Sequence, residues 1–425
     1  MLLYINFFSF KINQTIMPET LAAEPSLKIV LPLRPSYRID SIDLLRGLVM
    51  IIMALDHTRD FFHKAALTDD PLNLATTTPI LYFTRWITHL CAPIFVFLAG
   101  AGAYFQSMRK NKKQLSAFLI KRGLWLVFIE IFVIGFAFSF DAHYTIIGLQ
   151  TIWSIAISMI ILGLMIWLPF NAILITGLII VLGHNALDFF EKTLKASPGW
   201  WYDLLHHQGF YPLWDNHSLL ILYPFLSWSG LMMLGYCFGK LFVQYEEVQR
   251  KKILLWLGLG VIAFFIVLRY VNKYGDPDPW STQRNARVTF LSFMNVHKYP
   301  PSLLYMCATV GIGILFLAIV GHKKTWLTRF ITVYGRVPFL YYVLHFFLIH
   351  FISAICFLAR GHSYAEGLKM HPEVMPAKFI AAGEGYSLFA VYIIWICVVV
   401  SLYPICKWFS EHKQNNKGKW WLSYL

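Results

Sequence analysis

Long apolar runs separated by short polar connections make up most of this sequence. A run of about 20 apolar residues lets a helix cross a bilayer once, and these runs are apolar all round, unlike the alternating strands of a membrane barrel. The pattern therefore predicts an all-α protein, a polytopic transmembrane helix bundle of about ten spans. The expected spans cover residues 42–58, 86–106, 119–138, 144–168, 171–187, 217–243, 253–271, 302–321, 337–358 and 386–409.

Basic residues between the spans indicate how the bundle is oriented. The segment RKNKKQLSAFLIKR (109–122) contains six basic residues and no acidic ones, and three more follow the sixth expected span at 250–252. With ten spans, these clusters lie on the same side as the N-terminus, and the positive-inside rule places that side in the cytoplasm. We therefore expect both termini to be cytoplasmic.

The same topology divides the chain into three parts. We expect a cytoplasmic leader at 1–37, a transmembrane domain at 38–409 and a cytoplasmic tail at 410–425. Met17 is an alternative to Met1 as the start of translation. The expected location is the cell (inner) membrane, with the chain crossing it several times.

The composition excludes several classes of protein. Hydrophobic residues make up 58% of the chain and charged residues 14%, whereas a soluble domain carries about 25% charged residues. The basic clusters at the cytoplasmic face explain the net charge of +14, so the expected partner is the lipid bilayer and not nucleic acid. The six cysteines form no CxxC or histidine-spaced motif, so no metal is predicted. The oligomeric state is left open, a homodimer included.

The first expected span carries polar residues of chemical interest in the stretch RIDSIDLLRGLVMIIMALDHTRDFFH. At 100° per residue, Asp43, Arg46 and His57 lie on one helical face. The eleven residues from Arg46 to His57 correspond to roughly 16 Å along the helix axis. Histidine titrates near neutrality, so His57 is a candidate general base or acyl acceptor, with its neighbour Asp56 as the orienting group.

The same residues also have a purely structural interpretation. Arg46 is then a cytoplasmic anchor whose side chain reaches the membrane interface, and Asp43, three residues earlier, forms an ion pair with it. The polar stretch around Arg59 is then only the end of a span. The residues alone do not choose between these interpretations.

Further polar residues lie within other expected spans. Titratable groups at membrane depth are costly and usually face a cavity or a partner. Taken singly, each histidine is more often a packing residue, and as a set they also fit a proton relay, while their spacing supports no metal site. Together with Asp43 and Arg59, these residues are expected to form a substrate pocket: Arg85, His89, Glu130, His345 and His350.

Five blocks of the sequence resemble a known family. They are SIDLLRGLVMIIMALDHTRDFF (41–62), HLCAPIFVFLAG (89–100), YPFLSWSGLMMLGYCFG (223–239), KYPPSLLYM (298–306) and GRVPFLYYVLHFFLIH (335–350). They resemble the bacterial membrane proteins grouped with heparan-alpha-glucosaminide N-acetyltransferase, and the resemblance runs from about Arg38 to about Trp408. The spacing of Arg46 and His57 is also similar to that in the sugar-modifying transmembrane O-acyltransferases.

This resemblance implies a membrane-embedded acyltransferase. The acyl group, acetyl above all, would pass from cytoplasmic acetyl-CoA or another acyl-CoA to a sugar or glycan acceptor on the outer side. A histidine after the first span is the proposed catalyst in those groups, which implies His57, oriented by Asp56. His63 is a rival, because the histidine of the animal enzyme lies somewhat later. An acid stands in the family where this sequence has His89, so the identity of the acceptor is not carried over.

The basic residues nearest the cytoplasm are expected to contact the phosphates of CoA. They are Arg46, Arg109, Lys110, Lys121 and Arg122. A second hypothesis is a transporter or flippase for a lipid-linked or anionic solute, in which the embedded charges line a translocation path. A third is a scaffold subunit whose charges pair with a partner. Binding of CoA distinguishes the enzyme from the other two.

Overall fold

A computed structural model describes residues 39–194, 197–321, 325–369, 375–416, 418–419 and 422. The leader expected at 1–37 lies outside the described residues. The longer helices are α1 (Asp40–Phe62), α3 (Cys91–Ser107), α4 (Lys112–Phe128), α6 (Thr151–Met165), α7 (Phe170–Gly183), α10 (Phe225–Gly239), α12 (Glu247–Val271), α14 (Leu303–Ile319), α16 (Pro338–Ala359) and α18 (Leu388–Asn415). The shorter helices are α2 (Pro79–Thr88), η1 (Ile129–Ile134), α5 (Gly135–Ser139), η2 (His184–Ala186), α8 (Leu187–Glu191), α9 (Trp200–Leu205), α11 (Leu241–Gln244), α13 (Ala286–Met294), α15 (Trp326–Arg336) and α17 (Tyr364–Gly367).

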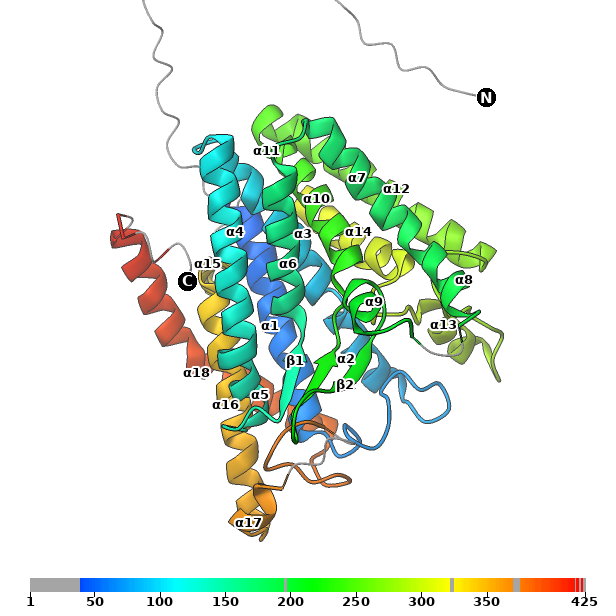
Figure 1. Ribbon diagram of the computed structural model, residues 1–425, viewed down its shortest axis with the longest axis vertical. Coiled ribbons are helices and arrows are strands. Elements are labelled where there is room, and N and C mark those ends of the chain that lie inside the picture. The colour runs from blue at the N-terminus through cyan, green and yellow to red at the C-terminus, as the bar shows by residue number, and fades with distance from the viewer. Residues whose placement is uncertain are drawn as a thin grey trace, which may run out of the picture. The chain divides into compact units, whose positions relative to one another are not determined.

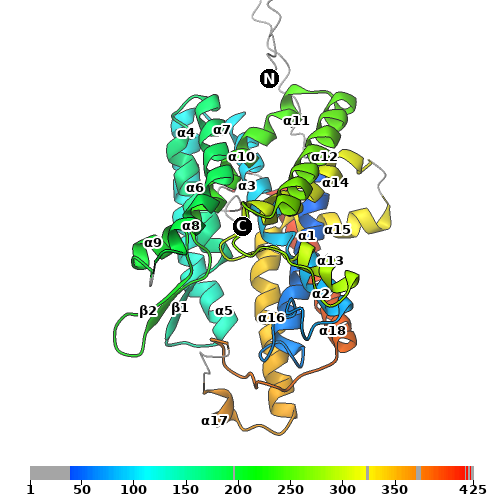
Figure 2. The same ribbon diagram turned by 90° about the vertical axis from the view of Figure 1, so that its right-hand side faces the viewer.

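The described residues form a mostly helical multi-pass membrane protein (Figure 1, Figure 2). Each of the ten expected spans overlaps a helix. Six stretches are long and apolar enough to cross a bilayer: Pro79–Ser107, Phe170–Glu191, Phe225–Gln244, Glu247–Val271, Pro338–Ala359 and Leu388–Asn415. The apolar helices α6 and α14 are shorter. Ten crossings and cytoplasmic termini therefore remain predictions.

The expectation of an all-α protein is wrong where two expected spans begin. β1 (Ile146–Leu149) pairs in parallel with β3 (Ser218–Ile221), which pairs antiparallel with β2 (Gly209–Pro212). The spans expected at 144–168 and 217–243 thus start as strands before α6 and α10 begin. A short apolar run has the same hydropathy as a strand or as a helix, so its pattern does not separate the two.

α1 lies among several helices and contacts α2, α3, α14, α15, α16 and α18. Its approach to α15 depends on two glycines that face each other. A Cβ atom built on Gly335 would lie 1.8 Å from the carbonyl oxygen of Asp43, and one built on Gly47 would lie 2.0 Å from that of Ile331. These neighbours are backbone atoms and cannot rotate away. The two helices can therefore approach this closely only because both positions are glycine.

We expect Gly335→Ala to destabilise the protein by about 1–3 kcal/mol, the usual effect of adding volume to a tightly packed interior. Gly102→Ala in α3 is the matched control, because nothing lies within 4 Å of its added Cβ and alanine favours a helix over glycine. Thermal unfolding in detergent compares the two variants. Equal unfolding temperatures would show that α1 and α15 can separate without cost.

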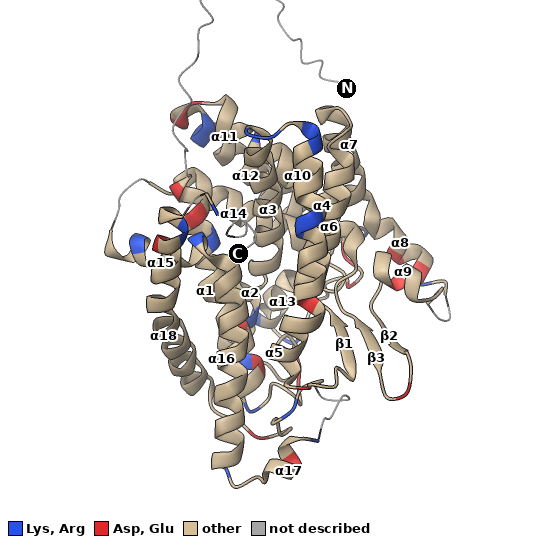
Figure 3. Ribbon diagram, turned by 60° about the vertical axis from the view of Figure 1, so that its left-hand side comes forward, with Lys and Arg blue, Asp and Glu red and all other residues tan. Residues whose placement is uncertain are grey.

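The two ends of the bundle differ in charge. Many lysines and arginines lie at the end where α11 is found and where α4 begins after the capping box formed by Asn111 and Gln114 (Figure 3). We call this the basic end, and the end where α1 finishes the opposite end. α18 continues to Asn415, so the tail expected at 410–425 begins inside a helix.

Candidate functional site

Buried charges meet where α1 approaches the opposite end, and the Asp56 carboxylate is at their centre. Nη1 of Arg85, from α2, donates to Oδ1 of Asp56 at 2.6 Å and also contacts Oδ2. Nη2 of Arg59 donates to Oδ1 at 3.1 Å, and Nζ of Lys298 lies 3.7 Å from Oδ2. Arg59 also pairs with Asp60. We call these five residues the ionic cluster.

The ionic cluster is assembled from three segments of the chain. Asp56, Arg59 and Asp60 follow one another within a turn of α1, at spacings that place their side chains on one face. Arg85 lies in the last turn of α2, and Lys298 lies in the connection between α13 and α14. The side chains of Asp56 and Arg59 are only 9% and 4% exposed, so each charge is tolerable there because it is paired.

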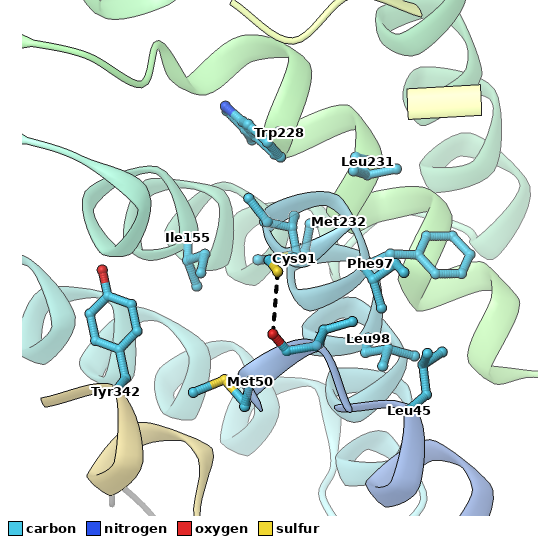
Figure 4. Packing of buried hydrophobic residues seen from close by; sticks show 14 of the residues in the cluster. Leu45, Met50, Cys91, Phe97, Leu98, Ile155, Trp228, Leu231, Met232 and Tyr342 are labelled. Carbon is cyan, nitrogen blue, oxygen red and sulfur yellow. Dashed lines mark hydrogen bonds between the residues drawn. The ribbon is translucent and has the colours of Figure 1, made fainter. Parts of the chain in front are cut away.

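A cavity of about 150 Å³ lies beside the ionic cluster. Its polar wall comes from the cluster, from His57 and from tyrosine and glutamine side chains, and its apolar wall comes from α1, α3 and α6. Figure 4 shows Met50, Ile155 and Tyr342, which line it, around Cys91, whose thiol donates to the carbonyl oxygen of Val49 at 3.2 Å. The lining residues are Met50, Met53, Asp56, His57, Asp60, Arg85, Thr88, Cys91, Ala92, Phe95, Phe138, Gln150, Thr151, Ile152, Ile155, Leu222, Tyr223, Lys298, Tyr299 and Tyr342.

His57 lines this cavity, as expected for the leading catalytic candidate. Its ring lies 4.1 Å from that of Phe346 and 5.3 Å from that of His345, measured between centroids. His345 is fully buried, and its Nδ1 contacts the carbonyl oxygen of Tyr341 at 3.0 Å. Asp56 was expected to orient His57, but no hydrogen bond between them is found among the described residues. The carboxylate of Asp56 instead binds the cations of the ionic cluster. The rings packed on His57 are those of Phe346 and His345.

The other expected pocket residues lie close to the cavity without lining it. His89 is 1% exposed and packs edge-on against Tyr305. Glu130, from the π-helical turn η1, accepts the backbone N–H of Gln150 at 2.7 Å, and so holds a residue that does line the cavity. His350 stacks on Phe140 at 3.7 Å between centroids, and its nitrogens contact two backbone carbonyl oxygens, a packing role.

His63 is separated from the cavity. It follows the last residue of α1, and its backbone bridges to Tyr386. Its Nδ1 accepts the N–H of Ala65 at 3.3 Å. The structure therefore brings His57, and not His63, to the wall of the cavity.

Arg46 and Asp43 lie toward the basic end of α1. They pair at 3.3 Å, and Arg46 also donates to the carbonyl oxygen of Gly335 in α15 at 3.3 Å. The cavity next to His57 reaches Met50 and Met53 on the same face of α1, but Arg46 does not line it. Arg46 thus shares a helical face with His57 but packs against α15, outside the lining of the cavity.

The expected CoA-contacting residues of the basic segment form a separate surface. Arg109, Lys110 and Lys121 line an open hollow of about 520 Å³, in which the Lys110 ammonium lies 5.3 Å from the centre of the Phe118 ring. Arg122 is half-buried and does not line it. α3 begins at Cys91, which lines the cavity, and ends at Ser107, two residues before Arg109 of the hollow. The helix is about 24 Å long at the rise of an α-helix.

Lys298 and the tyrosines of the cavity were not among the site residues predicted from the sequence. Lys298 stands in a loop, outside the expected spans in which embedded charges were sought. Its one available signal was its position at the start of the KYPPSLLYM block. Tyr299 and Tyr342 are uncharged and count as hydrophobic residues, so the hydropathy pattern does not distinguish them from packing residues.

Hydrogen bonds fix the loop that carries Lys298. The carboxylate of Asp276 accepts the backbone N–H of His297 at 2.9 Å and the Ser302 hydroxyl at 2.7 Å. Nδ1 of His297 contacts Asp278 at 2.7 Å. Burial alone would lower the pKa of His297, but its hydrogen bond and ion pair with Asp278 raise that pKa above its ordinary value, and the same hydrogen bond lowers the pKa of Asp278.

A second polar group, on α8 and α9, contains ligand types that could hold a metal ion. Asp188, Glu191 and His206 place their ligand atoms within 4.8 Å of one another. Nδ1 of His206 contacts Glu191 at 2.7 Å, and its Nε2 contacts His184 at 3.2 Å. These protein contacts already use both ring nitrogens of His206, so hydrogen bonding accounts for the group.

The helical bundle, with its apolar helices and its buried ion pairs beside a small cavity, is that of a multi-pass membrane protein. Within that class, the family model described as heparan-alpha-glucosaminide N-acetyltransferase, catalytic, matches residues 38–268. This is more than half of the chain, and the chain belongs to this family. The match includes Asp56, His57 and Arg85, and it ends before Lys298. A comparison with curated proteins found no match.

Proposed function

We propose that this protein is an acyl-CoA-dependent acyltransferase of the cell membrane, with the basic end in the cytoplasm and a sugar or glycan acceptor on the other side. Family membership indicates a membrane acetyltransferase type of function. The observation that carries the more specific proposal is the position of His57: the imidazole lines a buried cavity beside the ionic cluster.

In the proposed reaction His57 is the general base. It takes the proton from an acceptor hydroxyl or amine as that group attacks the thioester carbonyl carbon, and the carbonyl π electrons move to oxygen. When the tetrahedral intermediate collapses, the carbon–sulfur bond breaks and the thiolate of CoA takes the proton from the imidazolium. No metal takes part in this scheme.

The basic hollow is the proposed contact for the CoA phosphates. Arg109, Lys110 and Lys121 provide three cations and an adjacent aromatic ring, Phe118, in an open site. CoA is elongated, so its phosphates can remain at the basic end while its acyl group extends along α3 toward the cavity. Arg46, which is held against α15, is the proposed intermediate contact on this route.

CoA binding by purified protein tests this proposal. A ligand at 100 times its Kd stabilises the folded state by about 2.7 kcal/mol, so acetyl-CoA is expected to raise the unfolding temperature. We expect replacement of Arg109, Lys110 and Lys121 by glutamine to weaken binding at least about tenfold, or about 1.4 kcal/mol. The matched control replaces Arg250–Lys252 by glutamine, which removes the same charge from the same end.

The outcomes separate enzyme from transporter. Stabilisation by acetyl-CoA that is lost in the first triple variant and kept in the control supports the proposed donor site. Equal weakening in both variants would indicate only a general effect of charge at the basic end. If no CoA derivative stabilises the protein, the acyltransferase proposal is contradicted and a transporter is favoured.

A further inference from the structure

The ionic cluster contains more positive than negative charge. Its three cations are Arg59, Arg85 and Lys298, and its carboxylates are Asp56 and Asp60, which leaves an excess of one positive charge. Nε of Arg59 is also buried without a hydrogen-bond partner among the described residues. The cluster therefore has more donors than acceptors, and an anionic group in the cavity would balance it.

Another buried carboxylate does not supply this balance. Glu130 accepts the N–H of Gln150 at the start of α6 and does not line the cavity. Its carboxyl group is thus directed at a helix N-terminus, and Gln150, not Glu130, lines the cavity.

Lys298 is the cation that the cluster needs least for its own neutrality. Asp56 already has Arg85 at 2.6 Å and Arg59 at 3.1 Å, whereas Nζ of Lys298 lies 3.7 Å away. The Lys298 side chain is only 9% exposed, lines the cavity, and has its ammonium 5.0 Å from the ring centre of Tyr299. Lys298 thus contributes a mostly buried positive charge to the wall of the cavity that His57 also lines.

The position of Lys298 is fixed before any ligand binds. The residue before it is held by Asp276 and Asp278, and Asp276 also holds Ser302 at the start of α14. Asp276 in turn lies 3.6 Å from Arg269, which donates to the backbone carbonyls of Asp278, Ser292, Phe293 and Asn295. A cation held in this way stabilises charge that develops during a reaction without paying to reorganise.

We propose that Lys298 forms an anion-binding position in the cavity and stabilises the oxygen that becomes negative during acyl transfer. The inference rests on the proposed function. As the acceptor oxygen or nitrogen bonds to the thioester carbon, His57 takes its proton and the carbonyl oxygen gains the electron pair and the negative charge. Lys298 donates a hydrogen bond to that oxygen until the carbonyl re-forms and the thiolate leaves. Lys298 is then a catalytic residue of this reaction.

One experiment tests the anion-binding position without any turnover. Acetate and acetamide have nearly the same shape and differ in charge, and the cavity of about 150 Å³ is large enough for either. At equal ionic strength, we expect acetate to raise the unfolding temperature of the wild type and acetamide not to. Lys298→Met should lose this shift, Lys298→Arg should keep part of it, and Lys273→Met, at an exposed lysine just after α12, should keep all of it.

A second experiment measures acyl transfer from acetyl-CoA. Loss of a group that acts only in the transition state lowers kcat and leaves KM nearly unchanged, and we expect Lys298→Met to lower kcat by about 10²- to 10³-fold. Partial recovery in Lys298→Arg would separate a charge effect from a folding defect. Wild-type kcat in Lys298→Met would overturn the catalytic role.

The two experiments fail in different ways. If acetate does not stabilise the wild type, or still stabilises Lys298→Met, the anion-binding position is wrong whatever the activity. If acetate binds through Lys298 but no acyl-CoA is turned over, the acyltransferase proposal fails while the anion-binding position stands, and an anionic solute becomes the expected ligand of the cavity.

Discussion

Replacing His57 by alanine is expected to lower the rate of acyl transfer by about 10²- to 10⁴-fold, the usual contribution of a positioned general base. The reason is its location: among the histidines proposed from the sequence, His57 lines the cavity beside the ionic cluster, whereas His63 follows the end of α1 and bridges to Tyr386. We expect His63→Ala to retain most of the wild-type rate. The measurement is the release of CoA thiol by purified protein given acetyl-CoA and a panel of sugars.

Pre-steady-state kinetics of the wild type distinguish two chemical roles for His57. A general base leaves no covalent intermediate, whereas an acyl-histidine would accumulate as a burst of thiol release before steady turnover. An unchanged rate in His57→Ala together with a loss in His63→Ala would transfer the catalytic role to the end of α1. It would also remove the reason for regarding the cavity as the place of reaction.

The helical architecture could be predicted from the sequence because it depends on a local property, the length of each apolar run. Apolar runs near 20 residues have few alternatives to a helix in a bilayer, and each of the ten expected spans overlaps a helix. The strand β1 was not accessible, because its pairing with β3 joins residues about 70 positions apart in the sequence. Such a pairing leaves no periodic signal in a four-residue apolar run.

The candidate site was accessible in part for the same reason. Asp56, His57 and Arg59 interrupt an apolar helix, and an interruption at membrane depth is visible in the sequence. The cations that pair with Asp56 come from other segments of the chain: Arg85 lies in a separate short helix, and Lys298 lies in a loop. Only Arg85 was expected to join the site, because its charge falls at the edge of an expected span, whereas a loop lysine resembles any solvated residue.

The position of Arg46 shows the limit of helical geometry. It lies on the same face of α1 as His57, but a face of a long helix meets different neighbours along its length. At Gly47 the neighbour is the backbone of α15, whereas at Met53 it is the cavity. Spacing along one helix therefore predicted which residues share a direction, and packing decided which of them share a space.

We expect Asp56→Ala to destabilise the protein by about 3–5 kcal/mol, the range for removing one partner of a buried ion pair. The substitution leaves Arg85 and Lys298 without their shared carboxylate, and Arg59 with Asp60 alone. Glu384→Ala is the control, because Glu384 is exposed in its ion pairs with Arg360 and His362, and exposed pairs contribute about 0–1 kcal/mol. Unfolding in detergent micelles, followed by denaturant titration, measures both.

The double variant Asp56→Ala with Arg85→Met shows where the destabilisation originates. If the cost arises from uncompensated charge, removing the arginine as well should recover part of it, with a coupling free energy of about 0.5–3 kcal/mol between the two sites. Additive losses would mean that Asp56 is held by something other than its pair with Arg85. Wild-type stability of Asp56→Ala would mean that water in the cavity solvates the cations, and the ionic cluster would then be a solvated surface and not a preorganised site.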